Sequence, residues 1–368
     1  MRAAACLLSL VLLAGCGSSS APPPHARTAS SPATGTAPAS PARRAAVDRL
    51  SLRRQVGEVL VLAFGGTTAP EYVTRALREG RVAGVILFGG NVADPGQLRA
   101  LTASLQRASG RRALVMTDQE GGTFHILPWA APHAAESDQV TPGAAGAAAR
   151  QAARDLRAVG VNVTLAPVAD LRRPGSALAA RTFPPPTAGP SVAAAVRAYA
   201  AGGVAATAKH FPGMGAARAN TDDAPATMPL TRGDLGPFRA AIAASVPLIM
   251  ASHATYPNVD PGHLASQSRL LLRDLLRRRL GFRGAVITDS IEARAVLARS
   301  SVETAAQRSL LAGADLILMT GDGSFRPISR AFLARARGDR AFRARVREAA
   351  ARVLALKARL GLSPPAAR

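Results

Sequence analysis

Residues 204–209 read Val-Ala-Ala-Thr-Ala-Lys, a short apolar run that ends in a charged side chain. Seven other runs of five to seven mainly apolar residues have the same form, at residues 59–64, 84–88, 113–118, 161–166, 247–253, 285–289 and 314–319. Runs of this length and composition are typical of strands buried on both faces, as in parallel sheets. The segments between them, such as residues 97–107 and 190–201, are long enough for crossover helices.

Eight alternations of strand and helix predict a single α/β domain with a (β/α)8 TIM-type barrel, and favour it over an open doubly wound sheet. No Gly-x-Gly-x-x-Gly sequence opens the first predicted helix, which argues against a dinucleotide-binding sheet. Residues 341–360 follow the eighth run and predict a last amphipathic helix. We therefore assign residues 46–363 to the barrel and residues 364–368 to a short tail.

The N-terminal end has the pattern of an export signal. Arg2 is followed by an apolar stretch over residues 3–13, and the sequence Leu-Ala-Gly-Cys over residues 13–16 comes next. The apolar stretch is too short to span a membrane. The Leu-Ala-Gly-Cys ending resembles the lipobox of bacterial lipoproteins, which implies that residues 1–15 are removed and that Cys16 carries a diacylglyceryl group. The alternative is an ordinary secretory signal with an incidental cysteine.

Residues 16–45 are predicted to link this cysteine to the barrel. Beyond Cys16 the segment consists almost wholly of Ser, Pro, Ala, Thr, Gly and Arg, without an apolar period. Such a segment cannot bury enough apolar surface to offset the entropy of ordering, so we expect a disordered spacer. The resemblance implies an extracytoplasmic lipoprotein of the actinobacterial type, held at the outer face of the cytoplasmic membrane. Two acyl chains would give it stable anchoring.

Cysteine and lysine are both rare in this chain. The two cysteines are Cys6, in the predicted signal, and Cys16, so the barrel has no thiol for a disulfide or a metal. The net charge is +23, yet of the 46 basic residues only Lys209 and Lys357 are lysines. The arginines are scattered among many Ala and Gly residues, which indicates GC-rich coding more than a selected basic face. We expect attraction to anionic envelope polymers, and no nucleic-acid partner, metal or cofactor.

Polar residues cluster where five of the predicted strands end. They are Asp118, Gln119 and Glu120 at the third run, Asp170 after the fourth, Lys209 and His210 at the fifth, His253 at the sixth and Asp289 at the seventh. The carboxyl ends of barrel strands meet at one mouth, where the active site of such a barrel lies. Asp170 alone would also suit a turn, and His253 alone a buried core position. Taken together, the set predicts a functional site at the mouth.

Several of these segments resemble the signature sequences of glycoside hydrolase family 3. They are Asp-Gln-Glu-Gly-Gly at 118–122, Ala-Pro-Val-x-Asp at 166–170, Arg-Thr-Phe at 181–183, Lys-His-Phe-Pro-Gly-x-Gly at 209–215 and Val-Ile-Thr-Asp at 286–289. The likeness covers residues 50–335 and is greatest to the single-domain β-N-acetylglucosaminidases, also called β-N-acetylhexosaminidases. It implies retaining hydrolysis of a terminal β-linked N-acetylglucosamine from peptidoglycan fragments or envelope glycans.

The resemblance also implies roles for individual residues. Asp289 matches the family's nucleophile, which forms a covalent glycosyl-enzyme. The residues assigned to substrate binding are Asp118, Arg181, Lys209, His210 and His253. Asp118 matches a group that binds the far hydroxyl of the terminal sugar, and Arg181 matches one near the N-acetyl group. Lys209 also stands out independently, because a compact ammonium in an arginine-rich chain indicates a geometry that a planar guanidinium would not serve.

The acid/base pair of the family is missing from this chain. In the glucosaminidases that it resembles, an aspartate and, six residues later, a histidine follow Lys-His-Phe-Pro-Gly. Ala216 and Asp222 stand at those positions here. Thr123 and Ile126 replace two arginines that usually follow Asp-Gln-Glu-Gly-Gly, so we expect an altered outer pocket.

Three hypotheses are therefore open. In the first, Asp222 or Asp223 supplies the proton as a carboxylic acid, which requires a pKa raised by burial or by the charge of Asp289. In the second, the barrel is a lipid-anchored glycan-binding protein with little or no turnover. In the third, it cleaves a different β-glycoside. We favour the first, with Asp289 and Asp222 as the catalytic pair.

Overall fold

The computed structural model describes residues 41–321 and 323–364. The predicted signal peptide, Cys16 and most of the predicted linker lie outside the described residues, as does all of the predicted tail except Pro364. Within the described ranges, no helix is both long enough and apolar enough to cross a membrane.

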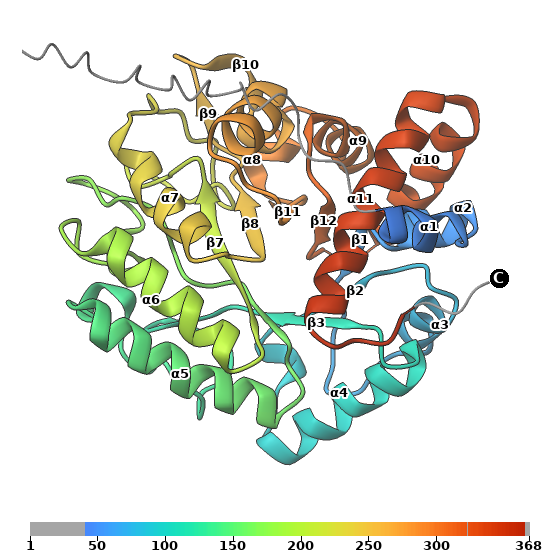
Figure 1. Cartoon of the computed structure of the whole chain (residues 1–368), viewed down its shortest axis with the longest axis horizontal. Coiled ribbons are helices and arrows are strands. Elements are labelled where there is room, and N and C mark those ends of the chain that lie inside the picture. The colour runs from blue at the N-terminus through green and yellow to red at the C-terminus, as the bar shows by residue number, and fades with distance from the viewer. Residues whose placement is uncertain (1–40, 322, 365–368) are drawn as a thin grey trace, which may run out of the picture. The chain divides into compact units, whose positions relative to one another are not determined.

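Eight parallel strands close into a barrel, which confirms the predicted fold (Figure 1). They are β1 (Leu60–Leu62), β2 (Gly84–Leu87), β3 (Leu114–Thr117), β6 (Val163–Thr164), β7 (Ala205–Phe211), β8 (Leu248–Ala251), β11 (Ala285–Ser290) and β12 (Leu316–Met319). Their order around the barrel follows the chain, and β1 completes the ring by pairing with both β2 and β12. Each strand overlaps one of the eight apolar runs.

A helix follows each barrel strand and covers the outside of the ring (Figure 1). In chain order these are α3 (Glu71–Arg78), α4 (Pro95–Ser109), α5 (Pro142–Ala158), α6 (Ala188–Ala201), α7 (Gly236–Ala243), η6 (Leu270–Arg279), α9 (Val302–Ala312) and α10 (Phe325–Gly338). α4 and α6 confirm the helices predicted at 97–107 and 190–201. η6 is a π-helix, and the pattern continues at its end, where the Leu280 amide donates to the Leu275 carbonyl at 2.9 Å.

Short elements fill the connections. α1 (Pro41–Asp48) and α2 (Leu52–Gly57) precede the barrel, and α8 (Arg294–Leu297) follows β11. Two antiparallel ribbons project from the barrel. They pair β4 (Gln119–Gly121) with β5 (Phe124–His125), and β9 (Thr255–Tyr256) with β10 (Asp260–Leu264). The single-turn helices are η1 (Gly89–Asn91), η2 (Glu136–Asp138), η3 (Ala179–Arg181), η4 (Gly233–Leu235) and η5 (Ala265–Gln267).

The strands are buried on both faces, as the apolar runs predicted. On β12, Leu316 and Leu318 belong to the cluster inside the barrel, whereas Ile317 and Met319 belong to the cluster between the barrel and its helices. All four are at most 2% exposed. Burial of each such side chain contributes about 1.5–3 kcal/mol to folding, so the runs specify the closed sheet strongly.

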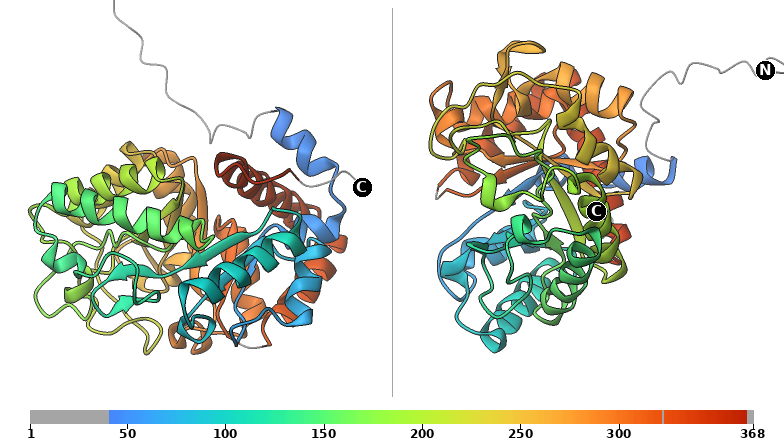
Figure 2. Two further views of the ribbon diagram at one scale, coloured as in Figure 1. Left: turned by 90° about the horizontal axis from the view of Figure 1, so that it is seen from below. Right: turned by 90° about the vertical axis from the view of Figure 1, so that its left-hand side faces the viewer.

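The last helix closes the amino-terminal end of the barrel. α11 (Arg340–Arg359) corresponds to the helix predicted at 341–360, and it lies beside α1 (Figures 1 and 2). Its Val353 and Leu356 pack among the interior side chains of the barrel. Just beyond it, the Ser363 amide donates to the carbonyl of Arg111, which precedes β3, at 3.0 Å. The opposite end, where the strands finish, is left for the functional site.

Buried ion pairs fasten α11 to the barrel. Asp315, at the start of β12, is fully buried and pairs with Arg277 at 2.5 Å, Arg345 at 2.7 Å and Arg352 at 3.3 Å. Lys357 Nζ pairs with a Glu58 oxygen at 2.6 Å. Removing one partner of a buried pair costs far more than removing an exposed one, so these contacts fix where α11 sits.

Candidate active site

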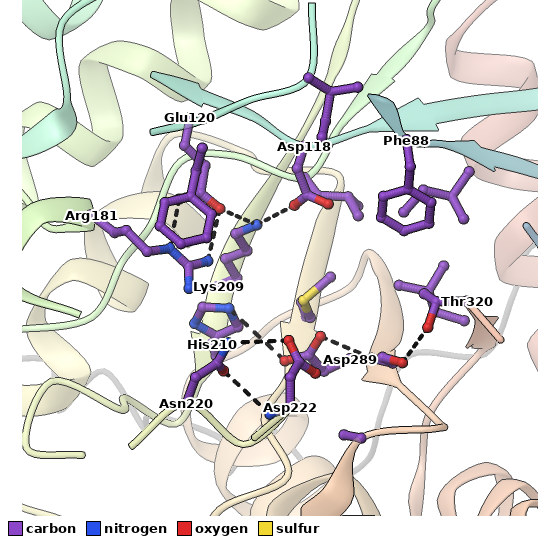
Figure 3. Close-up of a pocket in the computed structure, with 18 of the residues that line it drawn as sticks. Phe88, Asp118, Glu120, Arg181, Lys209, His210, Asn220, Asp222, Asp289 and Thr320 are labelled. Atoms are coloured by element: carbon purple, nitrogen blue, oxygen red, sulfur yellow. Dashed lines mark hydrogen bonds and ion pairs between the residues drawn. The ribbon is translucent and has the colours of Figure 1, made fainter. Parts of the chain in front are cut away.

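A cavity of about 400 Å³ opens at the carboxyl ends of the barrel strands (Figure 3). Its wall includes Phe88 after β2, Asp118 after β3, Lys209 and His210 on β7, Asp289 on β11 and Thr320 after β12. Arg181 and Asp222 join this wall from loops. The structure therefore brings together seven of the residues singled out in the sequence: Asp118, Glu120, Arg181, Lys209, His210, Asp222 and Asp289.

One side of the cavity is a network of buried ion pairs. Lys209 Nζ lies 2.5 Å from Asp118 Oδ1 and 2.6 Å from Glu120 Oε1. Arg181 donates to both Glu120 oxygens at 2.8 Å, and its guanidinium lies 4.2 Å from the centre of the Phe124 ring. Lys209 and Glu120 are each only 2% exposed. The network holds cations and anions at fixed positions against whatever enters the cavity.

Every ionisable member whose pKa departs from its ordinary value is held in its charged form. Burial by itself would raise the pKa of Glu120, but Lys209 and Arg181 lower it to about 2. Burial by itself would lower the pKa of Lys209, but Asp118 and Glu120 raise it above the ordinary lysine value. These groups remain ionised at neutral pH, so they are suited to hydrogen bonding rather than to proton transfer.

The ribbon that carries Glu120 depends on its glycines and on Gln119. Gly121 has φ +104°, and a Cβ atom there would lie 2.3 Å from the Ala134 carbonyl oxygen. Gln119 is fully buried, and its amide nitrogen donates to the Ala130 carbonyl at 2.9 Å. The Asp-Gln-Glu-Gly-Gly segment thus combines two cavity acids with the residues that hold their ribbon in place.

A second group joins Asp170, His210 and Asp289. His210 Nδ1 lies 2.7 Å from Asp170 Oδ2, and Asp170 Oδ1 accepts the amide of Met214 at 2.6 Å. This contact orients the imidazole so that Nε2 faces Asp289, with its nitrogen 4.0 Å from Oδ2 (Figure 3). Asp170 is 1% exposed and lies behind the ring, so it positions His210 rather than facing the cavity.

Asp289 is kept ionised at the end of β11. Its Oδ1 accepts the amide of Ser290 at 2.8 Å. Burial by itself would raise the pKa of Asp289, but the neighbouring His210 and the Ser290 amide are among the groups that lower it below the usual aspartate value. An ionised carboxylate on a rigid strand end has the properties of a nucleophile.

Asp222 lies close to Asp289 in the loop between β7 and η4 (Figure 3). Asn220 donates to its Oδ2 at 3.2 Å, and the Asp222 carbonyl accepts the amide of Arg294 in α8 at 3.2 Å. Although solvent reaches Asp222, the surrounding protein and the charge of Asp289 raise its pKa to about 6. Its neighbour Asp223 is exposed like Asp222 but is not among the residues that line the cavity.

His253 is placed differently from the other predicted site residues. Its side chain is fully buried, its Nδ1 lies 2.8 Å from the Ser266 hydroxyl, and it is not among the residues that line the cavity. Burial lowers the pKa of His253, so the imidazole is neutral next to the backbone of Asp289 and Ser290. The geometry favours support of the strand that carries Asp289 over direct contact with a substrate.

The structure adds cavity residues that the sequence did not single out. Phe88, Glu292 and Thr320 are among them, and Glu292 Oε2 accepts the Thr320 amide at 2.9 Å. Thr123 and Ile126, which stand at the positions of the two absent arginines, also line the cavity. The cavity is therefore less basic at these two positions than it would be with the arginines found in the sequences that this chain resembles.

The cavity pairs two carboxyl groups with opposite protonation. Asp289 is ionised, whereas Asp222 retains a proton up to about pH 6. A nucleophilic carboxylate beside a protonatable carboxyl is the arrangement that retaining glycosidases use. Among the described residues, no group of three or more His, Cys, Asp or Glu side chains is arranged to hold a metal ion.

Comparisons with known proteins agree with this geometry. Residues 51–356 match the glycosyl hydrolase family 3 N-terminal domain. The chain is 35% identical over 279 residues to a β-hexosaminidase of Xanthomonas oryzae pv. oryzae, covering 71% of this chain and 83% of that protein. A β-N-acetylglucosaminidase of Paenibacillus sp. superposes with a TM-score of 0.81 at 32% identity, over 87% of this chain and 64% of the other. A β-N-acetylhexosaminidase of Beutenbergia cavernae does so with a TM-score of 0.78 at 32% identity, over 84% and 99%.

Proposed function

The chain belongs to glycoside hydrolase family 3 and is a glycosidase of the β-hexosaminidase type, and we propose that it removes terminal β-linked N-acetylglucosamine with retention of configuration. The observation that carries this proposal is the pairing of ionised Asp289 with protonatable Asp222 in one cavity. The two steps of such a reaction need one group of each kind.

In the first step, Asp289 Oδ2 attacks the anomeric carbon of the terminal sugar. The bond from that carbon to the leaving oxygen breaks, and Asp222 gives its proton to this oxygen as it departs. The products are a free alcohol, a glycosyl ester on Asp289 and an ionised Asp222. His210, held by Asp170 at 2.7 Å, faces the nucleophile and contributes a hydrogen-bond donor at the sugar.

In the second step, water releases the sugar. The ionised Asp222 accepts a proton from a water molecule, whose oxygen attacks the anomeric carbon on the face that the leaving group vacated. The ester bond to Asp289 breaks, and both carboxyl groups return to their starting states. Two inversions at the same carbon give net retention.

The ion-pair network supplies the grip on the terminal sugar. Lys209 and Asp118 present a donor and an acceptor to adjacent hydroxyls, and Arg181 lies beside them above the Phe124 ring. Bidentate pairing with Glu120 fixes the guanidinium of Arg181 and leaves little freedom to lose when a sugar binds. A closed network at the back of the cavity favours removal of single terminal residues.

We further propose that the enzyme acts outside the cytoplasmic membrane. The support is the Leu-Ala-Gly-Cys segment at residues 13–16, which has the pattern of a lipid-modified cysteine. The predicted spacer between this cysteine and the barrel also supports it. An anchored glycosidase in that place meets peptidoglycan fragments and envelope glycans. One of the curated relatives, from Arthroderma benhamiae, is described as a secreted glycosyl hydrolase.

A glycan-binding protein without turnover is the second candidate. The observation that favours it concerns position 216, where the resemblance places the aspartate of the family's acid/base pair. Ala216 stands there instead, is exposed and does not line the cavity. In that case the network would still hold a sugar, and Asp222 would be a solvated loop residue.

Release of an aryl alcohol from aryl β-N-acetylglucosaminides by the purified chain separates the candidates. Asp289→Ala is expected to lose about a thousandfold or more in kcat/KM, and Asp222→Ala about a hundredfold with a poor leaving group. Asp223→Ala is the matched control, since it removes the neighbouring carboxylate from outside the cavity. Wild-type activity no higher than that of Asp289→Ala would refute the enzymatic proposal.

Azide tests the role of Asp222 in the second step. With an activated leaving group, Asp222→Ala still forms the glycosyl-enzyme, and azide attacks it without needing a general base. Turnover should rise with azide and yield the β-glycosyl azide. If Asp222→Ala keeps wild-type turnover and azide changes nothing, another group is the proton donor.

A further inference from the structure

A second groove lies on the outside of the barrel and has a strongly basic wall. It encloses about 520 Å³ between α2, the segment before β2 and α10. Its lining residues are Arg53, Arg81, Arg326, Ser329, Arg330, Leu333 and Arg337, which we call the arginine groove. None of these residues lines the catalytic cavity. α2 and α10 lie at the right-hand edge of Figure 1, away from α6 and α7.

The arginines converge on the groove through the geometry of α10. Arg326, Arg330 and Arg337 are separated by four and seven residues, a spacing that places side chains on one face of an α-helix. Arg53 faces them from α2, and Arg81 faces them from the segment before β2, where it lies 5.5 Å from the centre of the Phe325 ring.

Within residues 41–321 and 323–364, most of these charges lack an acidic partner. Arg81 pairs with Glu79 at 3.1 Å. The structure gives no ion pair to Arg53, Arg326, Arg330 or Arg337 among the residues that it describes. By contrast, Arg335, on another face of α10, pairs with Asp339 at 3.2 Å. Guanidinium groups that have no acidic partner among the described residues repel one another around the groove, and an anion that bridges them relieves that repulsion.

We propose that the arginine groove binds the phosphodiester groups of an anionic phospholipid surface. Guanidinium groups match phosphate oxygens in a bidentate manner, and clusters of several basic residues are the usual means of binding anionic membranes. The choice of a membrane rests on the proposed anchoring at Cys16. Arg53 follows this cysteine by only 37 residues, a stretch that spans no more than about 130 Å even when fully extended.

The consequence is a second, weak contact between the enzyme and the membrane. Anchoring keeps the phospholipid surface within reach of α2, so even a weak groove is occupied because its effective concentration is high. Contact through α2 and α10 would restrict how the barrel turns on its anchor, and hence the direction in which the catalytic cavity faces.

Vesicle binding tests this proposal without the lipid anchor. The full chain carrying Cys16→Ser is mixed with vesicles of phosphatidylcholine alone or with added phosphatidylglycerol, at about 0.1 M salt, where charges are screened over about 10 Å. The groove variant is Arg326→Gln/Arg330→Gln/Arg337→Gln. The matched control, Arg150→Gln/Arg197→Gln/Arg239→Gln, removes three exposed arginines from α5, α6 and α7.

We expect the preference for anionic over neutral vesicles to fall about a hundredfold in the groove variant, since each basic residue near such a surface contributes about fivefold. The control should lose less than about threefold. Hydrolysis of an aryl glycoside by each variant should be unchanged, which shows that the barrel is folded and separates this test from that of the catalytic proposal.

Three results would overturn the proposal. Equal losses in the groove variant and the control would show that only total charge matters. Equal binding to neutral and anionic vesicles by the unsubstituted chain would show no recognition of headgroups. Binding to soluble poly(glycerol phosphate) but not to anionic vesicles, lost in the groove variant, would assign the groove to a wall polymer instead of a membrane.

Discussion

Proton transfer by Asp222 predicts a specific dependence of activity on pH. Asp222 must be protonated to act on the leaving oxygen, and the surrounding protein and the charge of Asp289 raise its pKa to about 6. Asp289 must be ionised, and its pKa lies below the usual aspartate value. The specificity constant kcat/KM should therefore be highest between the pKa of Asp289 and the pKa of Asp222, in mildly acidic solution.

The size of the effect follows from the pKa of Asp222. With a pKa of about 6, about one-tenth of the enzyme carries the proton at pH 7 and about one-hundredth at pH 8. We expect kcat/KM to fall about tenfold for each pH unit above 6. An ordinary aspartate would place this decline about two pH units lower.

The assay compares two leaving groups. With a phenyl β-N-acetylglucosaminide, whose leaving oxygen needs a proton, kcat/KM should show the full decline above pH 6. With a dinitrophenyl leaving group, which needs no proton, kcat/KM should not decline. Asp289→Asn removes the neighbouring charge, so the pKa of Asp222 in that variant should fall below about 6, as measured by carboxyl carbon NMR. A flat profile above pH 6 with the phenyl glycoside, or the same decline in Asp222→Ala, would refute this reasoning.

Three further predictions concern the network and the loop. The pKa of Glu120 falls from 4.5 in the unfolded chain to about 2 in the folded one, so its ionisation contributes about 3 kcal/mol to the free energy of unfolding above pH 4.5, and this is lost as the pH falls toward 2. In urea unfolding, Glu120→Gln should lack this pH-dependent part of the stability. An unchanged pH dependence in the variant would contradict the prediction. Lys209→Arg should lower kcat/KM about tenfold or more, because the larger planar guanidinium does not fit where the Lys209 side chain is only 2% exposed. Activity within twofold of wild type would show that a compact ammonium group is not required there. Gly215→Ala should destabilise the protein by about 1–3 kcal/mol, because the new Cβ would lie 1.8 Å from the Leu171 carbonyl oxygen; an unchanged urea midpoint would show that the loop yields there.

The barrel could be predicted from the sequence because its strands are buried on both faces. Apolar runs of five to seven residues mark such strands without any knowledge of their partners, as β8 and β12 show. The polar residues that end the runs then fall at one mouth by topology alone. Asp118, Lys209, His210 and Asp289 could be grouped in this way, and the cavity contains all four.

Other features depend on contacts between distant parts of the chain. Glu120 could be grouped with Asp118 from the sequence, but its pairing with Arg181, 61 residues away, could not. The local sequence does not distinguish Asp222 from Asp223, yet only Asp222 is among the residues that line the cavity, and its carbonyl accepts the Arg294 amide of α8. His253 follows a strand as the other site residues do, but its ring turns to Ser266, outside the cavity. A side chain's direction at a strand end is set by its neighbours, and the strand pattern alone does not contain it.

Trapping the glycosyl-enzyme tests the central claim most directly. A fluorinated N-acetylglucosaminyl fluoride has an activated leaving group, and its ring fluorine slows both steps, so the ester on the nucleophile accumulates. Mass spectrometry of the digested protein should then find one sugar on the peptide that contains Asp289, and none in Asp289→Ala. An adduct on another residue, or rapid release of fluoride with no adduct at any time, would contradict a covalent intermediate at Asp289.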